Sequence, residues 1–257
     1  MKNLPESLLT YARERGLAEY QALQVFLQVL VLKNITWDEK RMIGGTVLVL
    51  GHSNPRFSED IDLTSVKNIL DLEKDLKKSV HEIEVWFQSK VVLSPPKKNT
   101  WKLSLTLREH SRIIRLHIDS QKYPTHSYHP IIVSFPGIPA FVVPSVALEE
   151  ILADKLIALA FRNYIGGRDV FDLWYHWFQG SRSQEKNKGV LSYLEKKKKD
   201  SGIDGDVIKK ICERLKGKIS ERCRDEWDRY LPQNFRNEKL HQDIYSTVLK
   251  KIKKLKV

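Results

Sequence analysis

The sequence has little cysteine and no long apolar run, and these two shortages exclude several classes of protein. Among its 257 residues are only two cysteines, Cys212 and Cys223, which are too few for a disulfide scaffold or a zinc cage. The longest apolar run, around Val29–Leu32, is interrupted by Gln24 and Gln28. It falls short of the roughly 18 to 20 residues of a membrane span, and the N-terminus has no signal-peptide layout. We therefore expect a soluble cytoplasmic protein with no stable membrane association.

Motifs of several enzyme classes are also missing. The sequence contains no GxSxG, GxxxxGK[ST] or GxGxxG stretch, and its eight histidines include no HExxH-like pair. What is present is an ordinary globular composition, with 41% hydrophobic and 30% charged residues, 12 Gly and 10 Pro. These values exclude a collagen-like or wholly disordered chain, and the length corresponds to one or two domains.

The net charge of +12 is concentrated in the last 77 residues. Residues 1–180 carry 22 Lys and Arg against 20 Asp and Glu, whereas residues 181–257 carry 22 against 12. A basic part next to a nearly neutral part indicates a polyanionic partner, most often nucleic acid. A solvated lysine-rich helical surface fits the same count equally well.

Apolar periodicity and turn formers predict strands flanked by helices in the first 135 residues and only helices after that, which is an α+β fold followed by an all-α part. Helices are expected at 8–32, 65–80, 146–162 with Ser145 as N-cap, from about 168 to 178, and beyond 190. Strands are expected at 46–50, 59–63, 101–107 and 112–119, the last two as an antiparallel hairpin. Proline-rich residues 124–144 are expected to be a connection, and 181–190 a linker.

Three carboxylates are the first candidates for chemistry. Asp60 and Asp62 are two apart on an expected strand, so their side chains share one face, and Asp119 shares the polar face of another strand with His117. If the two strands are neighbours, the three carboxylates converge on a site able to hold two metal ions, and Mg²⁺ is expected because it prefers oxygen ligands. Solvated edge residues, and for Asp119 a strand-end turn former, are the alternative interpretations.

Gly44-Gly45-Thr46 and Lys155 are the next candidates. A glycine pair lets backbone N–H groups approach a phosphate closely, although such pairs also simply form turns. Lys155 falls within the apolar stripe of its expected helix, where an unpaired ammonium would cost several kcal/mol. A phosphate or a carboxylate is its natural partner, unless it lies at the edge of the stripe and extends to solvent.

Asp169 and Asp172 open the helix that follows. They are three residues apart and therefore near neighbours on one helix face. Acidic residues are favoured in a first helical turn, so helix capping is an alternative to a catalytic role.

In order, these segments resemble the AbiEii type of DNA polymerase beta-like nucleotidyltransferases, the toxins of type IV toxin–antitoxin and phage-defence modules. The resemblance covers roughly residues 15–178. The motifs are GGTVLVLGHSNPRFSEDIDL at 44–63, LEEILADKL at 148–156 and RDVFDLW at 168–174.

The resemblance implies roles for these residues. Catalysis would involve Asp60, Asp62, Lys155 and, as the late acidic residue, Asp169 or Asp172. The NTP would be bound by Gly44, Gly45 and Thr46, with Arg56 and Ser58 lining the adjacent loop. Mg²⁺, or Mn²⁺ in its place, would be held by Asp60 and Asp62, with Asp119 in the superfamily's third acidic position. The parts would be a nucleotidyltransferase core at 1–140, a helical segment completing the active site at 141–180, and a basic helical region at 181–257.

The implied function is transfer of NMP from an NTP to an acceptor, with release of pyrophosphate. The basic C-terminal region favours RNA as acceptor, and the resemblance favours a tRNA 3′ end and a cognate antitoxin as partner. Three alternatives stay open. They are an inactive nucleic-acid or partner-binding module, an enzyme with a protein or small-molecule acceptor, and membrane-surface attachment through the amphipathic end around Leu249–Leu255.

Overall fold

The computed structural model describes residues 6–65, 72–107, 112–179 and 183–255. The chain forms two compact units. The first unit comprises Met1–Ser53 and Phe57–Val146. The second comprises Ala147–Val257 together with the short segment Asn54–Arg56, which lies between two stretches of the first unit in sequence. The expected division into a core at 1–140, a segment completing the active site at 141–180 and a basic region at 181–257 stays a prediction, because the two compact units do not show which part completes an active site.

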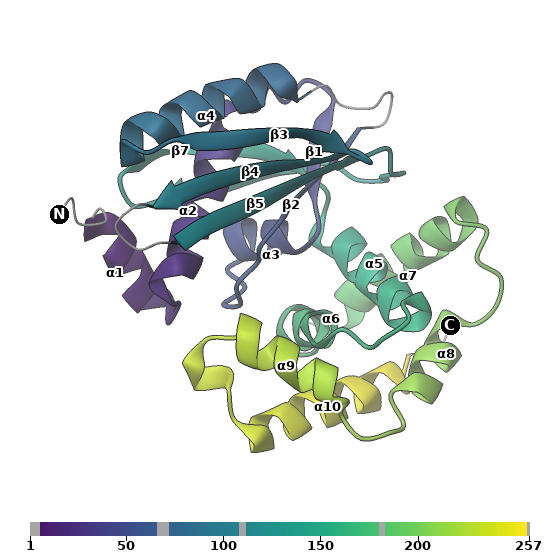
Figure 1. The fold of residues 1–257 in the computed structure, drawn as a ribbon. Coiled ribbons are helices and arrows are strands. Elements are labelled where there is room, and N and C mark those ends of the chain that lie inside the picture. The colour runs from purple at the N-terminus through teal and green to yellow at the C-terminus, as the bar shows by residue number, and fades with distance from the viewer. Residues whose placement is uncertain (1–5, 66–71, 108–111, 180–182, 256–257) are drawn as a thin grey trace. The chain divides into compact units, whose positions relative to one another are not determined.

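The first unit is a mixed seven-stranded sheet with helices packed on it (Figure 1). The strand order is β3-β4-β5-β2-β1-β7-β6. Strands β1 with β7 and β2 with β5 pair in parallel, and the other neighbours are antiparallel. The strands are β1 (Lys40–Ile43), β2 (Ile61–Ser65), β3 (Val91–Lys97), β4 (Thr100–Leu107), β5 (Arg112–Gln121), β6 (His129–Phe135) and β7 (Ile138–Ser145).

The hairpin expected from two alternating apolar segments is confirmed as β4 and β5, which pair antiparallel from Thr100↔Asp119 to Leu107↔Arg112. Leu103, Leu105 and Leu116 are fully buried. Period-two alternation of apolar residues was sufficient to predict these strands, because one face of each strand packs on the core.

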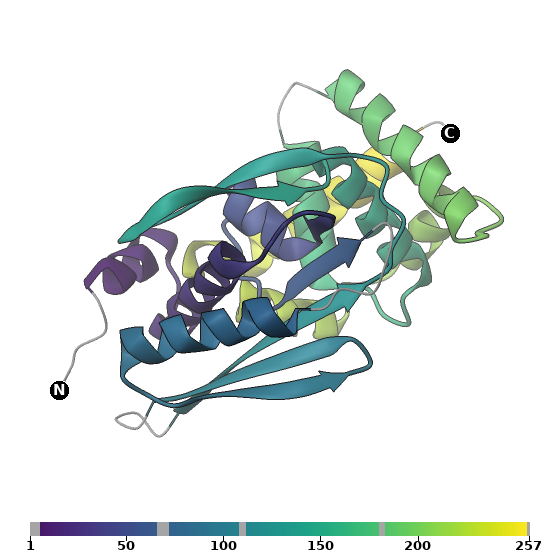
Figure 2. The ribbon, with the colours of Figure 1, turned by 90° about the horizontal axis from the view of Figure 1, so that it is seen from above.

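Helices α2 and α4 contact each other and lie over the sheet, α2 on β5 and β6 and α4 on β3 (Figures 1 and 2). The helices of this unit are α1 (Glu6–Arg15), α2 (Glu19–Asn34), α3 (Gly45–Gly51) and α4 (Glu73–Phe87). One helix over 8–32 was wrong, since Gly16, at a φ of 62°, separates α1 from α2. The helix expected at 65–80 starts later, at Glu73, and residues 66–71 lie outside the described residues.

The strand expected at 46–50 is instead helix α3. Four consecutive residues of this segment, from Thr46 to Val49, are buried. A short apolar run that is buried on all sides has no periodicity that separates a helix from a strand. The β-branched composition of TVLVL favoured the strand, and tertiary packing overrode that preference.

The proline-rich segment 124–144 is also different from the expectation, because most of it forms the hairpin β6–β7. Pro130 pairs opposite Pro144, and β7 meets β1 only at Met42↔Ser145. Most of β7 therefore needs ladder hydrogen bonds on one edge alone, which is the condition under which a strand accepts proline. Ser145 belongs to this strand and is not a helix cap, since its hydroxyl donates to the His129 carbonyl at 2.6 Å.

The second unit is helical over the described residues. Its elements are α5 (Leu148–Phe161), α6 (Gly167–Leu173), the π-helical turn η2 (Trp174–Phe178), α7 (Ser183–Asp200), α8 (Val207–Arg214), α9 (Glu221–Tyr230), the short η3 (Gln233–Phe235) and α10 (Glu238–Ile252). Their apolar faces share one core that includes Phe171, Trp177 and Trp227. The linker expected at 181–190 was wrong from Ser183 on, because α7 begins there.

Candidate active site

The first group of predicted site residues lies on neighbouring strands of the sheet. In the parallel pairing of β2 with β5, Asp62 is opposite Asp119 and Ile61 is opposite Ile118. Residues opposite each other in a ladder project on the same face, so the two carboxylates share a face while the two isoleucines, both fully buried, face the core. Asp60 precedes β2 by one residue, and its Oδ1 lies 3.4 Å from Nδ1 of His117.

Two buried glutamines of α2 hold the backbone of the acidic segment. The Gln28 side-chain amide donates to the carbonyl of Ser58 at 2.9 Å and to that of Asp60 at 3.4 Å. The Gln24 amide donates to the Glu59 carbonyl at 2.9 Å. Since buried polar groups are costly unless they are hydrogen-bonded, these residues fix the path by which the chain enters β2.

Thr46 and Ser58 are buried, and their hydroxyls bond to each other. The Thr46 hydroxyl lies 2.9 Å from that of Ser58 and also contacts the Asp60 carbonyl. Gly44, with φ of 80°, adopts a conformation that favours glycine, and a Cβ there would clash with Oδ2 of Asp62. The start of α3 and the acidic strand are therefore in close contact.

Asp119 accepts a hydrogen bond from the hydroxyl of Thr100 on β4. In the part of the chain that the structure describes, no three His, Cys, Asp or Glu side chains gather as a group that could hold a metal ion. The sheet therefore presents the acidic residues in register, with Asp60 beside His117 and Asp62 beside Asp119.

The second group of predicted site residues is a buried ionic cluster in the helical unit. Arg56 donates from Nε to Oδ1 of Asp172 at 2.6 Å and from Nη2 to Oδ2 at 2.9 Å. This is a bidentate pair between side chains that are 2% and 0% exposed. Such a pair is stable only when both charges stay matched, because an isolated buried charge is strongly unfavourable.

Lys155 extends the cluster. Its ammonium lies 2.7 Å from Oδ1 of Asp169 and 3.1 Å from Oδ2 of Asp172. Asp169 is also bound by Arg162, whose Nη1 lies 2.6 Å from Oδ2. A phosphate or a carboxylate was expected as the partner of this lysine, and in the structure its partners are two carboxylates. The two aspartates pair with cations and do not cap α6, whose N-cap is Gly166.

Asn54 completes the cluster. Its Oδ1 accepts from the backbone N–H of Arg56 at 3.1 Å, which directs its Nδ2 toward Oδ1 of Asp172 at 2.9 Å. The same Nδ2 lies 3.0 Å from Nε2 of His176. Because an amide nitrogen donates, this contact is a hydrogen bond in the tautomer in which Nε2 of His176 accepts.

Comparison with known proteins agrees with the order of the motifs. A family model described as nucleotidyl transferase AbiEii toxin, type IV TA system, matches residues 33–248. The chain belongs to the AbiEii family. It is therefore an enzyme of the nucleotidyltransferase kind and a toxin of a type IV toxin–antitoxin system, and the resemblance carried by the sequence motifs is confirmed.

One solved structure supports the fold. A crystal structure of JHP933 from Helicobacter pylori is similar at a TM-score of 0.50 and 17% identity, over 92% of this chain and 95% of that one. A structure described as a putative nucleotidyltransferase from H. pylori gives a TM-score of 0.48 and 17% identity, over 94% and 100% of the two chains. At this identity the first similarity concerns the fold alone, and it confirms the expected α+β core with a helical C-terminal part. No curated protein matches the chain.

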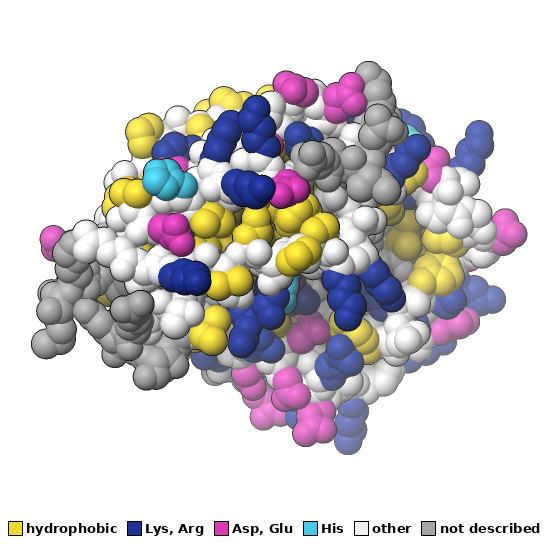
Figure 3. Space-filling view, turned by 45° about the horizontal axis from the view of Figure 1, so that its top comes forward, with side chains coloured by type: hydrophobic (Ala, Val, Ile, Leu, Met, Phe, Trp, Pro, Cys, Tyr) yellow, Lys and Arg dark blue, Asp and Glu magenta, His cyan; other side chains and the backbone are white. Residues whose placement is uncertain are grey.

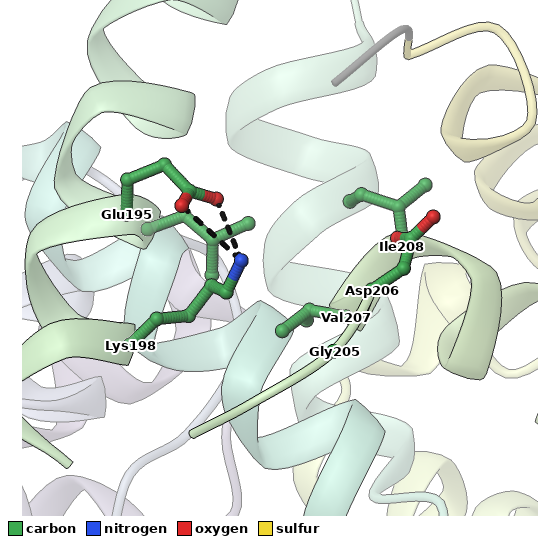
Figure 4. Close-up of a pocket in the computed structure, with 7 residues that line it drawn as sticks. Glu195, Lys198, Gly205, Asp206, Val207 and Ile208 are labelled. Carbon is green, nitrogen blue, oxygen red and sulfur yellow. Dashed lines mark hydrogen bonds and ion pairs between the residues drawn. The ribbon is translucent and has the colours of Figure 1, made fainter. Parts of the chain in front are cut away.

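Two further observations bear on what the AbiEii family member binds. Among the described residues, no helix combines the length and the apolar character that crossing a bilayer requires. A pocket of about 390 Å³ lies between α7 and the start of α8, lined by Leu194, Glu195, Lys198 and residues 205–208 (Figure 4). The Lys198 ammonium there is bound by the Glu195 carboxylate, and none of the predicted site residues lines this pocket.

Several residues around both groups were not predicted as parts of a site. They are Gln24, Gln28, Thr100 and His117 in the first unit and Asn54, Arg162 and His176 in the second. A signal existed for the glutamines, because two polar residues four apart in an otherwise apolar helix need buried partners. Asn54 and His176 carry no such signal, since they are 122 residues apart in sequence and only the fold brings them together.

The pKa of Asp172 predicts an acid-dependent loss of stability. Burial raises the pKa of this carboxyl, but the charges of Arg56 and Lys155 outweigh burial and lower the pKa from 3.8 to about 2. The stabilisation is therefore complete above pH ~4 and is lost as the pH falls from about 4 toward 2. We expect the Asp172 contribution to the free energy of unfolding to fall by about 2 kcal/mol over that window.

Urea unfolding of the wild type and of Asp172→Asn at pH 5, 4 and 3 measures this contribution. The difference between the two proteins should shrink as the pH falls, since the carboxyl of the unfolded wild type has the higher pKa, takes up a proton first and so favours unfolding. A constant difference would contradict the prediction.

Proposed function

We propose that the protein transfers a nucleoside monophosphate from an NTP to the 3′-hydroxyl of an RNA in the cytoplasm, with a tRNA 3′ end as the first candidate. Membership of the AbiEii family supports the reaction class. The observation that carries the choice of site is the register of β2 and β5, which aligns Asp62 with Asp119, while Asp60, just before β2, lies 3.4 Å from His117 of β5. Aligned carboxylates on adjacent strands are an arrangement suited to a divalent cation.

The donor set fits Mg²⁺, and Mn²⁺ would use the same oxygens. Mg²⁺ is commonly held by one or two carboxylates together with substrate phosphates, so Asp60 and Asp62 suffice without a cage of three or more protein ligands. Two neighbouring carboxylates also repel each other unless a cation lies near them. When bound, the ion compensates the charge of the triphosphate and of the departing pyrophosphate. Asp119, hydrogen-bonded to Thr100, is proposed as the third acidic group.

The chain's own residues would position the nucleotide. Gly44 has no side chain next to Asp62, and Gly44 and Gly45 are partly exposed, so their backbone could approach a phosphate, whereas Thr46 is buried. Thr46 and Ser58 would act by holding the loop, because their hydroxyls are already bonded to each other. This divides the predicted nucleotide-binding residues into contacting backbone and supporting side chains.

In the helical unit, Lys155 would neutralise phosphate charge. Two of its three ammonium protons are used by Asp169 and Asp172, and its side chain is 12% exposed. We propose that the remaining donor binds a phosphate oxygen, while the two aspartates hold the ammonium in place. Asp169 and Asp172 are then positioning residues for Lys155.

The proposed step conserves atoms and charge. The acceptor hydroxyl oxygen forms a bond to the α-phosphorus, the bond between the α-phosphorus and the bridging oxygen of the β-phosphate breaks, and pyrophosphate leaves with that oxygen. The hydroxyl proton passes to solvent. Catalysis comes from positioning and from charge stabilisation.

Incubation with each α-labelled NTP, Mg²⁺ and total RNA tests the proposal. Label should enter RNA from at least one NTP, release of pyrophosphate should match it, and EDTA should stop both. The 3′ location is checked by loss of the label on treatment with a 3′-exonuclease. Label in protein or in a small molecule would replace RNA by another acceptor. No transfer under any condition would favour an inactive binding module.

A further inference from the structure

The lysine-rich helix α7 is less available to an anion than its sequence suggests. Lys197 is 1% exposed, and its ammonium lies 2.9 Å from Glu150 and 3.3 Å from Asp154. Lys198 pairs with Glu195 at 3.0 Å. On the face of the molecule shown in Figure 3, basic side chains are interspersed with acidic and apolar ones. The net charge therefore does not by itself locate a binding surface.

Two cations of the helical unit lie instead on aromatic rings at the C-terminal end of α5. The Lys210 ammonium is 3.9 Å from the centre of the Phe161 ring, and the Arg222 guanidinium carbon is 3.3 Å from the centre of the Tyr164 ring. The two rings are three residues apart in sequence, and Phe161 is 40% exposed. We call Phe161, Arg162, Tyr164, Lys210 and Arg222 the cation–aromatic surface.

The two cations that lie on rings are not neutralised by neighbouring carboxylates, whereas Arg162 of the same surface pairs with Asp169. Lys210 and Arg222 are exposed, and within the described residues neither has a carboxylate at ion-pair distance. The position of Lys210 is defined, because Arg214, one turn further along α8, donates to the Leu159 carbonyl of α5 at 2.7 Å. Cations held by rings keep their charge available to an incoming anion.

Arg162 connects the surface to the ionic cluster. Its side chain is 48% exposed, and it binds Asp169, which also binds Lys155. An anion bound at the surface would therefore lie next to residues of the predicted site within the same unit.

A surface on which aromatic rings and cations alternate is suited to binding single-stranded RNA. Unpaired bases stack on aromatic rings and on guanidinium planes, while phosphates pair with the cations. An acidic peptide would use the cations but not the rings, and duplex RNA is recognised across its minor groove without stacking. We propose that the cation–aromatic surface binds the unpaired end of the RNA acceptor, an assignment that rests on the proposed function in taking RNA as the acceptor.

Binding of a fluorescein-labelled single-stranded RNA of about 12 nucleotides to the full chain tests the assignment. Lys210→Ala/Arg222→Ala should weaken binding about 10-fold or more, and should lower the slope of log affinity against log salt by about 0.7 per cation. The matched control is Lys196→Ala/Lys250→Ala, which removes the same charge and one lysine 5.0 Å above the Tyr193 ring. That control should change affinity by less than about 3-fold.

Tyr164→Leu separates stacking from charge. It removes a ring but no charge, and it should weaken RNA binding several-fold while the salt slope stays unchanged. Arg222→Lys, which keeps the charge without the planar group, should be intermediate. Thermal melts of each variant show whether it folds, and only variants that melt as the wild type are compared.

Three results would overturn the assignment. They are equal losses in the surface variant and the control, equal competition by poly-glutamate and by unlabelled RNA, and unchanged binding by Tyr164→Leu. Because binding is measured without NTP, failure here differs from failure of the proposed reaction. An Asp60→Asn enzyme should bind RNA like the wild type and transfer nucleotide to it at least about 10²-fold more slowly.

Discussion

Asp60→Asn and Asp62→Asn are expected to lower nucleotidyl transfer at least about 10²- to 10³-fold while the fold is retained. The fold is expected to be retained because Gln28 and Thr46 hold the backbone of the acidic segment through the Asp60 carbonyl, and this contact does not involve the substituted side chains. Asparagine has nearly the same shape but carries no charge, so the compensation of triphosphate charge is lost. Transfer of labelled nucleotide at saturating Mg²⁺ measures the effect.

The matched control is Asp38→Asn, an exposed carboxylate of the same unit. It should leave transfer within about twofold of the wild type. Raising Mn²⁺ should restore part of the activity of the site variants if their defect is weak metal binding. Near-normal transfer by Asp60→Asn and Asp62→Asn would mean that the reaction does not take place at these two carboxylates.

Asp172→Ala is expected to lower the free energy of unfolding of the helical unit by about 3 to 5 kcal/mol. The carboxylate is fully buried and binds Arg56 and Lys155, so its removal takes away the bidentate ion pair of a buried guanidinium and one of the two carboxylates at Lys155. Few single substitutions have effects of this size, and loss of a buried charge partner is one of them. Urea unfolding followed by tryptophan fluorescence measures the change.

Two further variants test the cause. Asp225→Ala removes an exposed carboxylate from α9 of the same unit and should cost less than about 0.5 kcal/mol. Arg56→Met combined with Asp172→Leu removes both charges and should recover part of the stability lost in Asp172→Ala, since a buried ion pair can often be replaced by apolar residues. If Asp172→Ala is as stable as the wild type, the pair contributes no net stability and its role is in the reaction.

Local sequence patterns predicted some elements of the fold well and others poorly, for definable reasons. The β4–β5 hairpin was predicted because each strand has one buried and one solvated face, which produces alternation. Helix α3 was not predicted, because an apolar run buried on all sides has no periodicity. The β6–β7 hairpin was not predicted either, because prolines are accepted along a strand that is paired mainly on one edge. The start of α7 was missed because Ser, Gly and Lys are only weakly unfavourable in a helix that packs on its neighbours.

The candidate site shows the same limits. Although Asp60 precedes β2 and is not part of it, the position of Asp62 on a strand and that of Lys155 in an apolar helical stripe follow from residue spacing. The partners of these groups do not, since Asp119 reaches Asp62 through a parallel pairing of strands more than 50 residues apart. The same holds for Arg56 and Asp172, which are 116 residues apart.

By itself, the sequence determined the family, the reaction class and the residues that carry charge, because motifs and periodicities are local properties of a chain. It also located the excess of basic residues in the last 77 positions. Only the tertiary structure decided which charges remain available. Lys197 and Lys155 are both bound by carboxylates, whereas Lys210 and Arg222 lie on aromatic rings. Pairing depends on contacts between distant segments, and the folded chain alone specifies those contacts.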